Sequence, residues 1–396
     1  MAGSSMLGAG EVMAALAHSH PAEALIVGGG PAGAALGIML ARAGHAVEII
    51  EQTASMHDKV CGEFLSWEAV TYIAQLGIDL RALGAVPIYK MRLASRQCIA
   101  ECKLPFPAMS ITRRRLDEAL LTSAIKAGAV VLRGRRVEAL QRSGPIWTAL
   151  LTGGIARCAP AAFLATGKHD LGGHRRPPGK QNDLVAFKMY FRLSPAAEQA
   201  LRGRIDLILF PGGYAGMQLT EDNAANLCLV VNRRTLYSCR YEWPRLLERI
   251  CHSSPYLANQ LEAAEALLPK PLALSSIPYG LLPTDSQSGL WRLGDQAAVI
   301  PSFSGDGMSI AFHTAQVAAE IYLRGGAAPE LTARLQKDLS RSVHFATLLS
   351  RLMITAPWLS ILVRLWPPLL RAFASQTRVP QNAMLSQRPL TPSHER

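Results

Sequence analysis

The sequence predicts an α/β (α+β) fold, in which a domain of alternating strands and helices is interrupted by a β-rich segment and followed by a C-terminal helical segment. Three observations predict this organisation. Residues 23–51 follow the order strand, glycine turn, helix, strand. Strand-like apolar runs then gather at Leu184–Leu193, Ile205–Phe210 and Ala225–Val231, and a helical stretch spans Trp243–Leu268. After residue 290 the chain returns to a strand, a turn and a long helix from Gly307 to about Leu323.

Composition limits the classes of function. The chain has 396 residues, 49% of them hydrophobic, and a net charge of +12. The basic residues are scattered in pairs and triplets rather than in one run, which does not favour nucleic-acid binding and fits an anionic cofactor or an anionic membrane surface. Seven cysteines without a CxxC pair indicate neither a disulfide framework nor a metal site, and they favour a reducing cytoplasm. Residues 1–22 lack the pattern of a secretory signal.

The first element of the alternating domain is a dinucleotide-binding turn. Gly28 permits a tight turn after the strand Ala24–Val27, Gly30 lets the backbone approach a pyrophosphate, and Gly33 allows close packing of helix on strand. Glu51 ends the second strand, where its carboxylate suits ribose hydroxyls and disfavours a phosphorylated ribose. A glycine turn of purely structural kind is the alternative. The same site is expected to include Pro31, Ala32 and Gln52.

A second motif occupies residues 292–311, RLGDQAAVIPSFSGDGMSIA. It resembles the GD motif of the para-hydroxybenzoate hydroxylase and geranylgeranyl reductase superfamily, whose members bind FAD. The resemblance implies that Asp295 bonds the ribityl chain, although a helix cap is the simpler alternative for this residue. It also implies that the flavin ring is lined by Pro301, Gly305, Asp306, Gly307 and Met308.

Two shorter matches point to the same superfamily. Arg113 precedes Leu116-Asp117 at the spacing of its Arg-x-x-Phe/Leu-Asp helix, which implies contact with the cofactor; a surface arginine is the alternative. Cys61-Gly62 resembles the Cys-Gly signature of geranylgeranyl reductases, which places both beside the flavin and makes Cys61 a candidate catalytic residue. A buried, inert cysteine is the alternative. Where the family ends its cofactor domain with an Asp-Gly pair, this chain has Thr166-Gly167.

The resemblance implies a Rossmann-type FAD-binding domain with an inserted β-rich substrate domain. We assign residues 23–80, 100–175 and 276–330 to the discontinuous FAD-binding domain, 81–99 and 176–275 to the substrate domain, and 331–396 to the C-terminal helical segment.

The chemistry stays open between three hypotheses. Geranylgeranyl reductases carry a Tyr-x-Trp-x-Phe-Pro element, of which this chain has the Phe-Pro pair, Phe210-Pro211, but not the tyrosine and tryptophan before it. The Trp-x-Trp-x-Ile-Pro signature of flavin halogenases is absent. The favoured hypothesis is an NAD(P)H-dependent monooxygenase that hydroxylates a lipophilic aromatic or polyketide-type substrate. A reductase of isoprenoid C=C bonds and an electron-transfer flavoprotein are the alternatives. FAD is the expected cofactor and NAD(P)H the expected reductant.

The C-terminal segment is apolar and basic. Arginines at 351, 364 and 371 punctuate apolar runs that are too short to span a bilayer. These runs predict either peripheral membrane contact through residues 350–375 or helical packing over the substrate domain. Both predict a lipophilic small-molecule substrate for a cytoplasmic protein, with or without membrane association.

Overall fold

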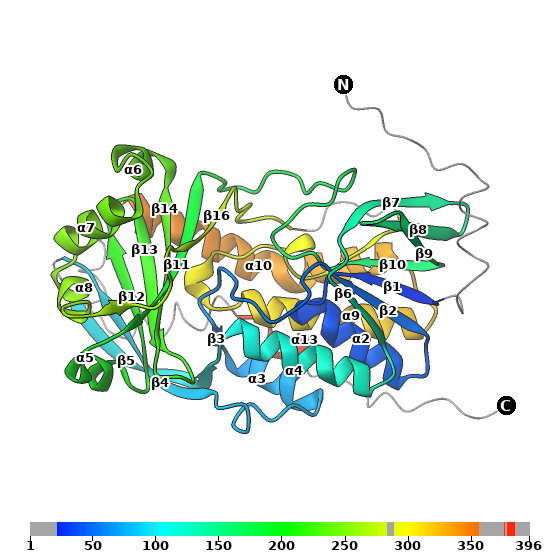
Figure 1. Cartoon of the computed structure of the whole chain (residues 1–396), viewed down its shortest axis with the longest axis horizontal. Coiled ribbons are helices and arrows are strands. Elements are labelled where there is room, and N and C mark those ends of the chain that lie inside the picture. The colour runs from blue at the N-terminus through cyan, green and yellow to red at the C-terminus, as the bar shows by residue number, and fades with distance from the viewer. Residues whose placement is uncertain (1–21, 97, 283–288, 356–375, 377, 385–396) are drawn as a thin grey trace.

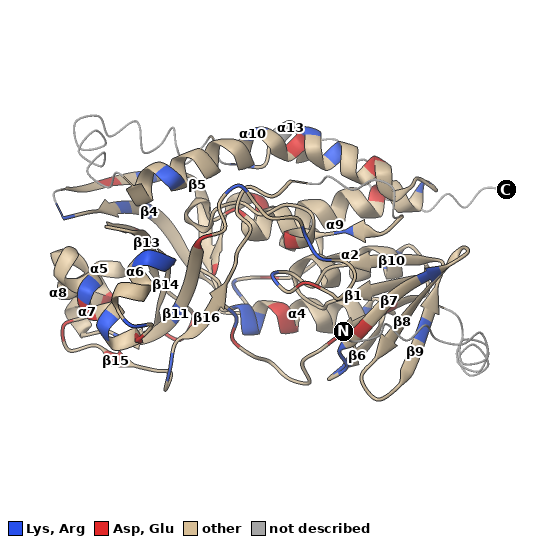
Figure 2. Ribbon diagram, turned by 90° about the horizontal axis from the view of Figure 1, so that it is seen from above, with Lys and Arg blue, Asp and Glu red and all other residues tan. Residues whose placement is uncertain are grey.

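A computed structural model of the chain describes residues 22–96, 98–282, 289–355, 376 and 378–384. Two sheets lie at opposite ends of the molecule, and helix α10 (Ala328–Thr355) runs along both of them (Figures 1 and 2). At one end stands a five-stranded parallel sheet, and at the other a larger, mainly antiparallel sheet. This confirms the predicted fold class.

The parallel sheet has the strand order β17-β10-β1-β2-β6. Its central strands are short apolar runs, and all four residues of β1 are buried, as expected for a parallel sheet that is covered on both faces. Its strands are β1 (Ala24–Val27), β2 (Val47–Glu51), β6 (Val130–Arg133), β10 (Ala161–Leu164) and β17 (Trp291–Arg292).

The two faces of this sheet bury different layers. Alternation along β1 sends Ile26 to one face and Leu25 to the other. Ile26 packs among helices α2 (Pro31–Arg42), α3 (Trp67–Gln75), α4 (Arg113–Lys126), α9 (Gly307–Leu323) and α10. Leu25 packs beneath a three-stranded sheet that consists of β7 (Val137–Ser143), β8 (Ile146–Leu151) and β9 (Ile155–Ala159).

The large sheet has the order β15-β11-β14-β13-β12-β4-β5-β3, with β16 also paired to β11. The three predicted apolar runs are its strands β11, β12 and β14. Strand β5 reaches Ser110 within this sheet, past the boundary proposed at residue 99. Its strands are β3 (Phe64–Leu65), β4 (Val86–Ala94), β5 (Ile99–Ser110), β11 (Leu184–Arg192), β12 (Arg204–Phe210), β13 (Gly213–Leu219), β14 (Ala225–Asn232), β15 (Glu265–Ala266) and β16 (Leu272–Ser275).

The outer face of the large sheet packs on four short helices. They are α5 (Pro195–Leu201), α6 (Arg233–Ser238), α7 (Trp243–Ser253) and α8 (Pro255–Gln260). The predicted helix over Trp243–Leu268 is therefore wrong in its length. Ser254 ends α7 and accepts a hydrogen bond from the Leu257 backbone N–H as the N-cap of α8, so a cap and a proline restart the chain in a new direction.

The long helix α9 begins and ends where the sequence predicts, at Gly307 and Leu323.

No helix within the described residues is long and apolar enough to cross a membrane. Residues 356–375, most of the segment expected to contact a membrane, lie outside the described residues. Short helix α13 (Gln381–Met384) follows, and Val379 and Met384 pack into the core around α2, α3 and α9.

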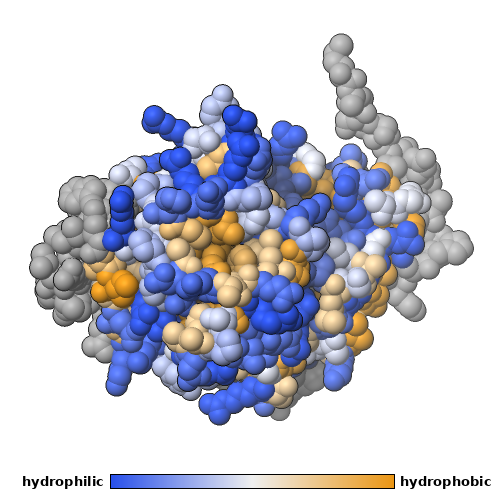
Figure 3. All heavy atoms as spheres, turned by 60° about the vertical axis from the view of Figure 1, so that its left-hand side comes forward, coloured by the Kyte–Doolittle hydropathy of each residue, from blue (hydrophilic) through white to orange (hydrophobic). Residues whose placement is uncertain are grey.

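The face of the molecule seen in Figure 3 is mostly hydrophilic. On the face that includes the large-sheet end, apolar residues gather in a central area that hydrophilic residues border (Figure 3).

Candidate active site

One cavity of about 1110 Å³ extends from the carboxyl ends of the parallel strands to the inner face of the large sheet. The edge at which parallel strands end is where open α/β sheets bind ligands. Most of the residues predicted from the motifs lie in its wall. They are Gly28, Gly30, Pro31, Ala32, Glu51, Gln52, Cys61, Gly62, Arg113, Asp295, Gly305, Gly307 and Met308. Gly33, Pro301 and Asp306 are predicted residues that do not line the cavity.

The turn between β1 and α2 needs its glycines for different reasons. Gly28 has φ +108°, and a Cβ there would lie 2.4 Å from the carbonyl oxygen of Ala165. A Cβ at Gly33 would lie 1.9 Å from the carbonyl oxygen of Gly28. At Gly30 the closest atom, Nη2 of Arg113, is 3.6 Å away. Gly28 and Gly33 therefore permit the turn itself, whereas Gly30 leaves open space in the cavity wall.

Glu51 is held at this turn. Its Oε2 accepts a hydrogen bond from the Gly29 N–H at 2.8 Å, and its Oε1 accepts two bonds from Thr53, from the N–H at 3.0 Å and the hydroxyl at 2.7 Å. Burial raises the pKa of this carboxyl, but the Lys59 charge and these hydrogen bonds outweigh burial, so that the pKa is lowered. Glu51 is thus an ionised acceptor at the cavity edge.

The second motif meets the first in space. A Cβ on Gly294 would lie 3.3 Å from the Cβ of Ala32, so the GD turn packs against the start of α2. Asp295 lines the cavity beside it. Gly305 is left-handed, with φ +73°, and a Cβ there would lie 2.5 Å from the Phe64 ring. The cavity wall is therefore assembled from segments that lie about 260 residues apart along the chain, since 294 − 32 is 262.

Arg113 lies in the wall next to Gly30. Its guanidinium donates two hydrogen bonds to Asp117, at 2.8 and 2.9 Å, and Lys59 donates a third at 2.9 Å. Burial disfavours the charge on Arg113, but Asp117 outweighs burial and raises the pKa of the guanidinium. The pKa of Asp117 is lowered, because Arg113 and Lys59 outweigh its burial. Asp117 thus holds two cations, Arg113 and Lys59, at the cavity wall, where their N–H groups could donate to a pyrophosphate.

The Cys61-Gly62 turn lines the cavity where its two ends join, and the large sheet holds it from behind. Asn226 donates to the carbonyl oxygens of Cys61 and Gly62, both at 3.1 Å, and Gln218 donates to that of Gly62 at 2.8 Å. Glu63 follows in the left-handed conformation, with φ +60°. These bonds fix the backbone of the turn relative to the large sheet, and the Cys61 Sγ accepts a hydrogen bond from the Glu63 N–H at 3.4 Å.

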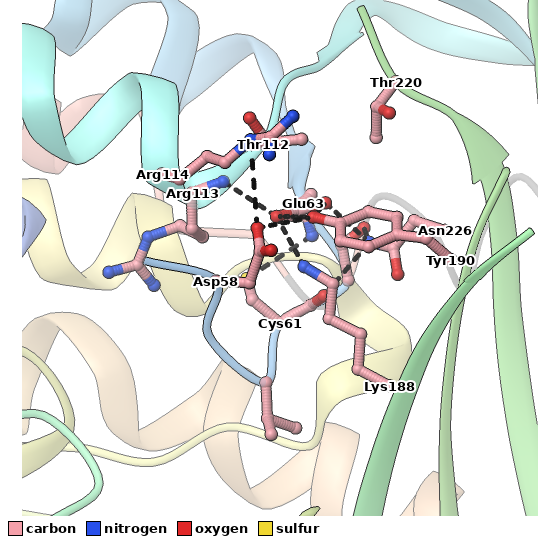
Figure 4. A network of polar contacts seen from close by, with 12 residues as sticks. Asp58, Cys61, Glu63, Thr112, Arg113, Arg114, Lys188, Tyr190, Thr220 and Asn226 are labelled. Atoms are coloured by element: carbon pink, nitrogen blue, oxygen red, sulfur yellow. Dashed lines mark hydrogen bonds and ion pairs between the residues drawn. The ribbon is translucent and has the colours of Figure 1, made fainter. Parts of the chain in front are cut away.

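Glu63 is the centre of this network (Figure 4). Its carboxylate, fully buried, forms an ion pair with Lys188 at 2.5 Å and accepts hydrogen bonds from the Tyr190 hydroxyl at 2.8 and 2.9 Å. The backbone N–H of Arg113 and the amide of Asn226 also donate to it. Burial raises the pKa of Glu63, although Lys188 and the hydrogen bonds act in the opposite direction. We name Glu63, Lys188, Tyr190, Gln218 and Asn226 the turn clamp.

The part of the cavity against the large sheet is apolar. Alternation along β11, β13 and β14 turns one set of side chains to the outer helices and the other to the cavity. Near Ser302, the hydroxyls of Tyr279 and Tyr214 lie 3.0 and 3.2 Å from its Oγ. Helix α10 closes another side. Apolar lining residues are Met91, Leu93, Ala186, Leu207, Leu209, Val230, Leu274, Ile277, Phe303, Leu349, Leu352 and Met353. We call this part the apolar chamber.

Sequence reasoning did not find the turn clamp. One signal was present: Lys188 interrupts the apolar run of β11, and a cation at such a position in a buried strand needs a partner. The position of that partner, on a loop 125 residues earlier, has no local signature.

Comparisons with known proteins agree with this geometry. Residues 21–154 match the family model described as FAD binding domain. A menaquinone reductase of Mycolicibacterium smegmatis is 25% identical over 356 residues, which cover 85% of each chain. A menaquinone reductase of Mycobacterium tuberculosis is 24% identical over 333 residues, 76% of each chain.

Solved structures share the fold. The halogenase PltM, in complex with phloroglucinol and FAD, superposes with a TM-score of 0.70 at 15% identity and covers 84% of this chain and 76% of its own. The flavin-dependent brominase Bmp2 gives a TM-score of 0.72 at 17% identity, over 93% and 98% of the chains. The myxobacterial chondrochloren halogenase CndH gives 0.72 at 18% identity, over 91% of each. At these identities the likeness shows the fold alone.

The residues of the cavity fit FAD. The N-terminus of α2 has no side-chain cap and faces the cavity through Gly30, so its backbone N–H groups and positive dipole suit a pyrophosphate. Glu51 stands at the end of β2, where a ribose would lie. Gly307, which begins α9, has no neighbouring atom within 4 Å of a Cβ and leaves room for a flat ring system. Together these findings support an FAD-binding flavoprotein of the oxidoreductase class.

Proposed function

We propose that this chain is an FAD-dependent reductase that saturates a C=C bond of a long, apolar substrate of the isoprenoid-quinone class. The observation that carries the proposal is the apolar chamber, which opens directly onto the Cys61-Gly62 turn and the start of α9. The relatives named menaquinone reductase add to it, because they align over most of both chains. The sequence alone favours a monooxygenase; the chamber together with these relatives leads us to prefer reduction.

The chamber would bind its substrate by burial of apolar surface. Leucine, methionine and valine side chains line it, and α10 contributes Leu349, Leu352 and Met353. Burial of an aliphatic chain contributes about 25 cal/mol per Å² of apolar area. The same walls exclude water from the reacting bond.

FAD, when bound and reduced, supplies the hydride, and the second carbon of the bond receives a proton. Cys61 is our candidate donor, because it lines the cavity where the chamber meets the cofactor end. Cys228 and Tyr279 line the same cavity. Burial raises the pKa of the Cys228 thiol to about 12 and that of the Tyr279 hydroxyl well above its usual value, so both keep their protons at neutral pH. A two-electron donor such as NAD(P)H would restore the reduced cofactor.

Anaerobic turnover tests the proposal. The purified protein, loaded with FAD and reduced by dithionite or NAD(P)H without oxygen, is mixed with menaquinone, and the product is weighed by mass spectrometry. Reduction of the quinone ring to the quinol also adds two hydrogens, so the product is reoxidised to the quinone in air before it is weighed. A C=C reductase then gives a quinone that is still heavier by two hydrogens per saturated bond, whereas ring reduction alone returns the starting mass. Product that appears only with oxygen and carries an added oxygen atom would favour the monooxygenase instead. Reoxidation by no small substrate would favour an electron-transfer flavoprotein.

A proton donor at position 61 has its own test. Cys61→Ser retains a weak donor and Cys61→Ala removes it. We expect the alanine variant to reduce substrate at least tenfold more slowly with unchanged FAD affinity. Equal rates in all three proteins would exclude Cys61 as the donor.

A further inference from the structure

Arg378, from the last described part of the chain, reaches the cofactor end of the cavity and lines it. Its Nη1 donates a hydrogen bond to Oδ1 of Asp306 at 2.8 Å and lies 3.6 Å from Oε2 of Glu68. Its guanidinium stands 3.8 Å from the centre of the Phe106 ring. One side chain thus contacts the turn before α9, helix α3 and strand β5, none of which lies near it in the sequence.

The charges around Arg378 explain why a cation is needed there. The side chains of Asp306 and Glu68 are both fully buried, and that of Arg378 is only 10% exposed. Two buried carboxylates at one site carry a large cost unless a cation offsets them. Arg378 lies close to both.

The position of these charges relates them to the cofactor. Asp306 immediately precedes α9, whose first residues Gly307 and Met308 line the cavity. A helix N-terminus favours an anion such as a reduced flavin. Negative charge from these carboxylates would oppose that effect, and the single positive charge of Arg378 offsets part of it.

The backbone around Arg378 is held in place. Val379, the next residue, is 1% exposed and packs in the core that contains α2, α3 and α9. Met384 packs in the same core. The cation is therefore set at a fixed position rather than on a free side chain at the surface.

We propose that Arg378 is a positioning residue through which the C-terminal segment sets both FAD affinity and the reduction potential of the bound flavin. The proposal rests on the assignment of FAD to this cavity and not on the substrate. FAD binding and potential are measured without substrate, so a failed menaquinone assay leaves this proposal standing.

The experiment compares Arg378→Gln with Arg378→Lys, which keeps the charge. FAD affinity is measured by fluorescence titration of the apoprotein and the midpoint potential by dye equilibration. We expect the glutamine variant to bind oxidised FAD about tenfold more weakly and reduced FAD about a hundredfold more weakly. That additional factor of ten corresponds to a potential about 30 mV more negative for a two-electron couple. The lysine variant should recover part of both losses.

Arg324→Gln is the matched control. Arg324 follows the last residue of the same helix α9 and pairs with Glu330 on the surface, with its side chain 64% exposed. This variant should change neither quantity. If Arg378→Gln lowers only the thermal stability of the apoprotein and leaves affinity and potential unchanged, Arg378 is a structural anchor and the proposal is wrong.

The Asp306→Asn variant tests the same proposal if the Arg378→Gln protein does not fold. Removal of a negative charge beside the start of α9 should move the flavin potential in the opposite direction, to more positive values. An unchanged or more negative potential in the Asp306→Asn protein would overturn the proposal.

Discussion

The glycines of the turn between β1 and α2 differ in what a side chain would meet. A Cβ at Gly33 would overlap the carbonyl oxygen of Gly28, whereas a Cβ at Gly30 has free space on the cavity side. Chain atoms fill the first position, and the second is left for a ligand. Two glycines of the same motif therefore have different roles: Gly33 is needed for the fold of the turn, and Gly30 for ligand binding.

Gly33→Ala and Gly30→Ala should therefore fail in different ways. Gly33→Ala is expected to destabilise the fold by several kcal/mol, because backbone must move to relieve a 1.9 Å contact. Gly30→Ala should fold normally and bind FAD at least tenfold more weakly, since its methyl group enters the cavity. Chemical denaturation of the apoproteins and FAD titration measure the two effects. Equal losses of stability in both variants would contradict this assignment.

The stability of the protein at low pH should depend on Asp117, which lies at the cofactor end of the cavity. Its pKa is lowered when folded, so the ionised carboxylate stabilises the protein above its unfolded pKa of about 3.9. That contribution is lost as the pH falls through the lower folded value. Asp117→Asn leaves Arg113 and Lys59 without their shared anion, and it should cost about 3 kcal/mol at pH 7.

Urea denaturation at pH 7 and below pH 4 tests this prediction. The difference in the free energy of unfolding between the Asp117→Asn variant and the unmodified protein should become smaller as the pH falls. Asp222→Asn is the control, because Asp222 pairs with arginines of the same helix but its side chain is 45% exposed, and it should cost less than about 1 kcal/mol. A gap that is independent of pH would show that the Asp117 charge is not its cause.

At the scale of elements, the two faces of the large sheet have different roles. Its outer face is mostly apolar and packs on α5 to α8, apart from the Arg204–Asp206 ion pair, which bonds to Tyr256 of α8. Its inner face is apolar over the chamber but polar in the turn clamp, where β11, β13 and β14 hold the Cys61-Gly62 turn. The three strands therefore hold the Cys61-Gly62 turn at a fixed position relative to the large sheet.

The buried pair of the turn clamp should show strong coupling. Glu63→Gln and Lys188→Met each leave one buried charge without its partner, and each should cost about 3 kcal/mol. The double variant should cost clearly less than the sum, because neither charge remains. Thermal or chemical denaturation of the four proteins completes the cycle. Additive losses would mean that the two residues do not act as a pair.

An exposed pair on the same strand provides the control. Arg192 and Glu265 join β11 to β15 with both side chains 66% exposed. Glu265→Gln should change stability by less than about 1 kcal/mol.

Element boundaries followed from the sequence where local signals were strong. Gly307 and Leu323 bound α9 as predicted, because glycines lie on both sides of a run that contains no proline and no internal glycine. The stretch 243–268 was wrong as one helix, because a Ser-Ser-Pro sequence inside it caps and restarts the chain. Periodicity alone does not reveal such a break.

At the scale of the whole molecule, the cavity lies between the parallel sheet and the large sheet. Its cofactor end belongs to the parallel sheet and its chamber to the large sheet. The two ends should therefore be separable by substitution. Ala186, buried on the inner face of β11, lines the chamber only.

Ala186→Trp should fill part of the chamber without touching the cofactor end. We expect unchanged FAD affinity and at least a tenfold loss in the rate of anaerobic reoxidation by menaquinone. Ala266→Trp, at an exposed position of the neighbouring strand β15, should change neither. Loss of FAD affinity in the Ala186→Trp protein would show that the two ends are not independent.

The sequence by itself determined the cofactor turn, the second glycine motif and most of the cofactor-side wall of the cavity. These depend on local backbone geometry, which glycine positions such as Gly28 and Gly305 record directly. Only the tertiary structure decided which distant charges meet, as in Glu63 with Lys188 and Asp306 with Arg378. Ion pairs between remote segments have no sequence period, and their energy depends on burial that exists only after folding.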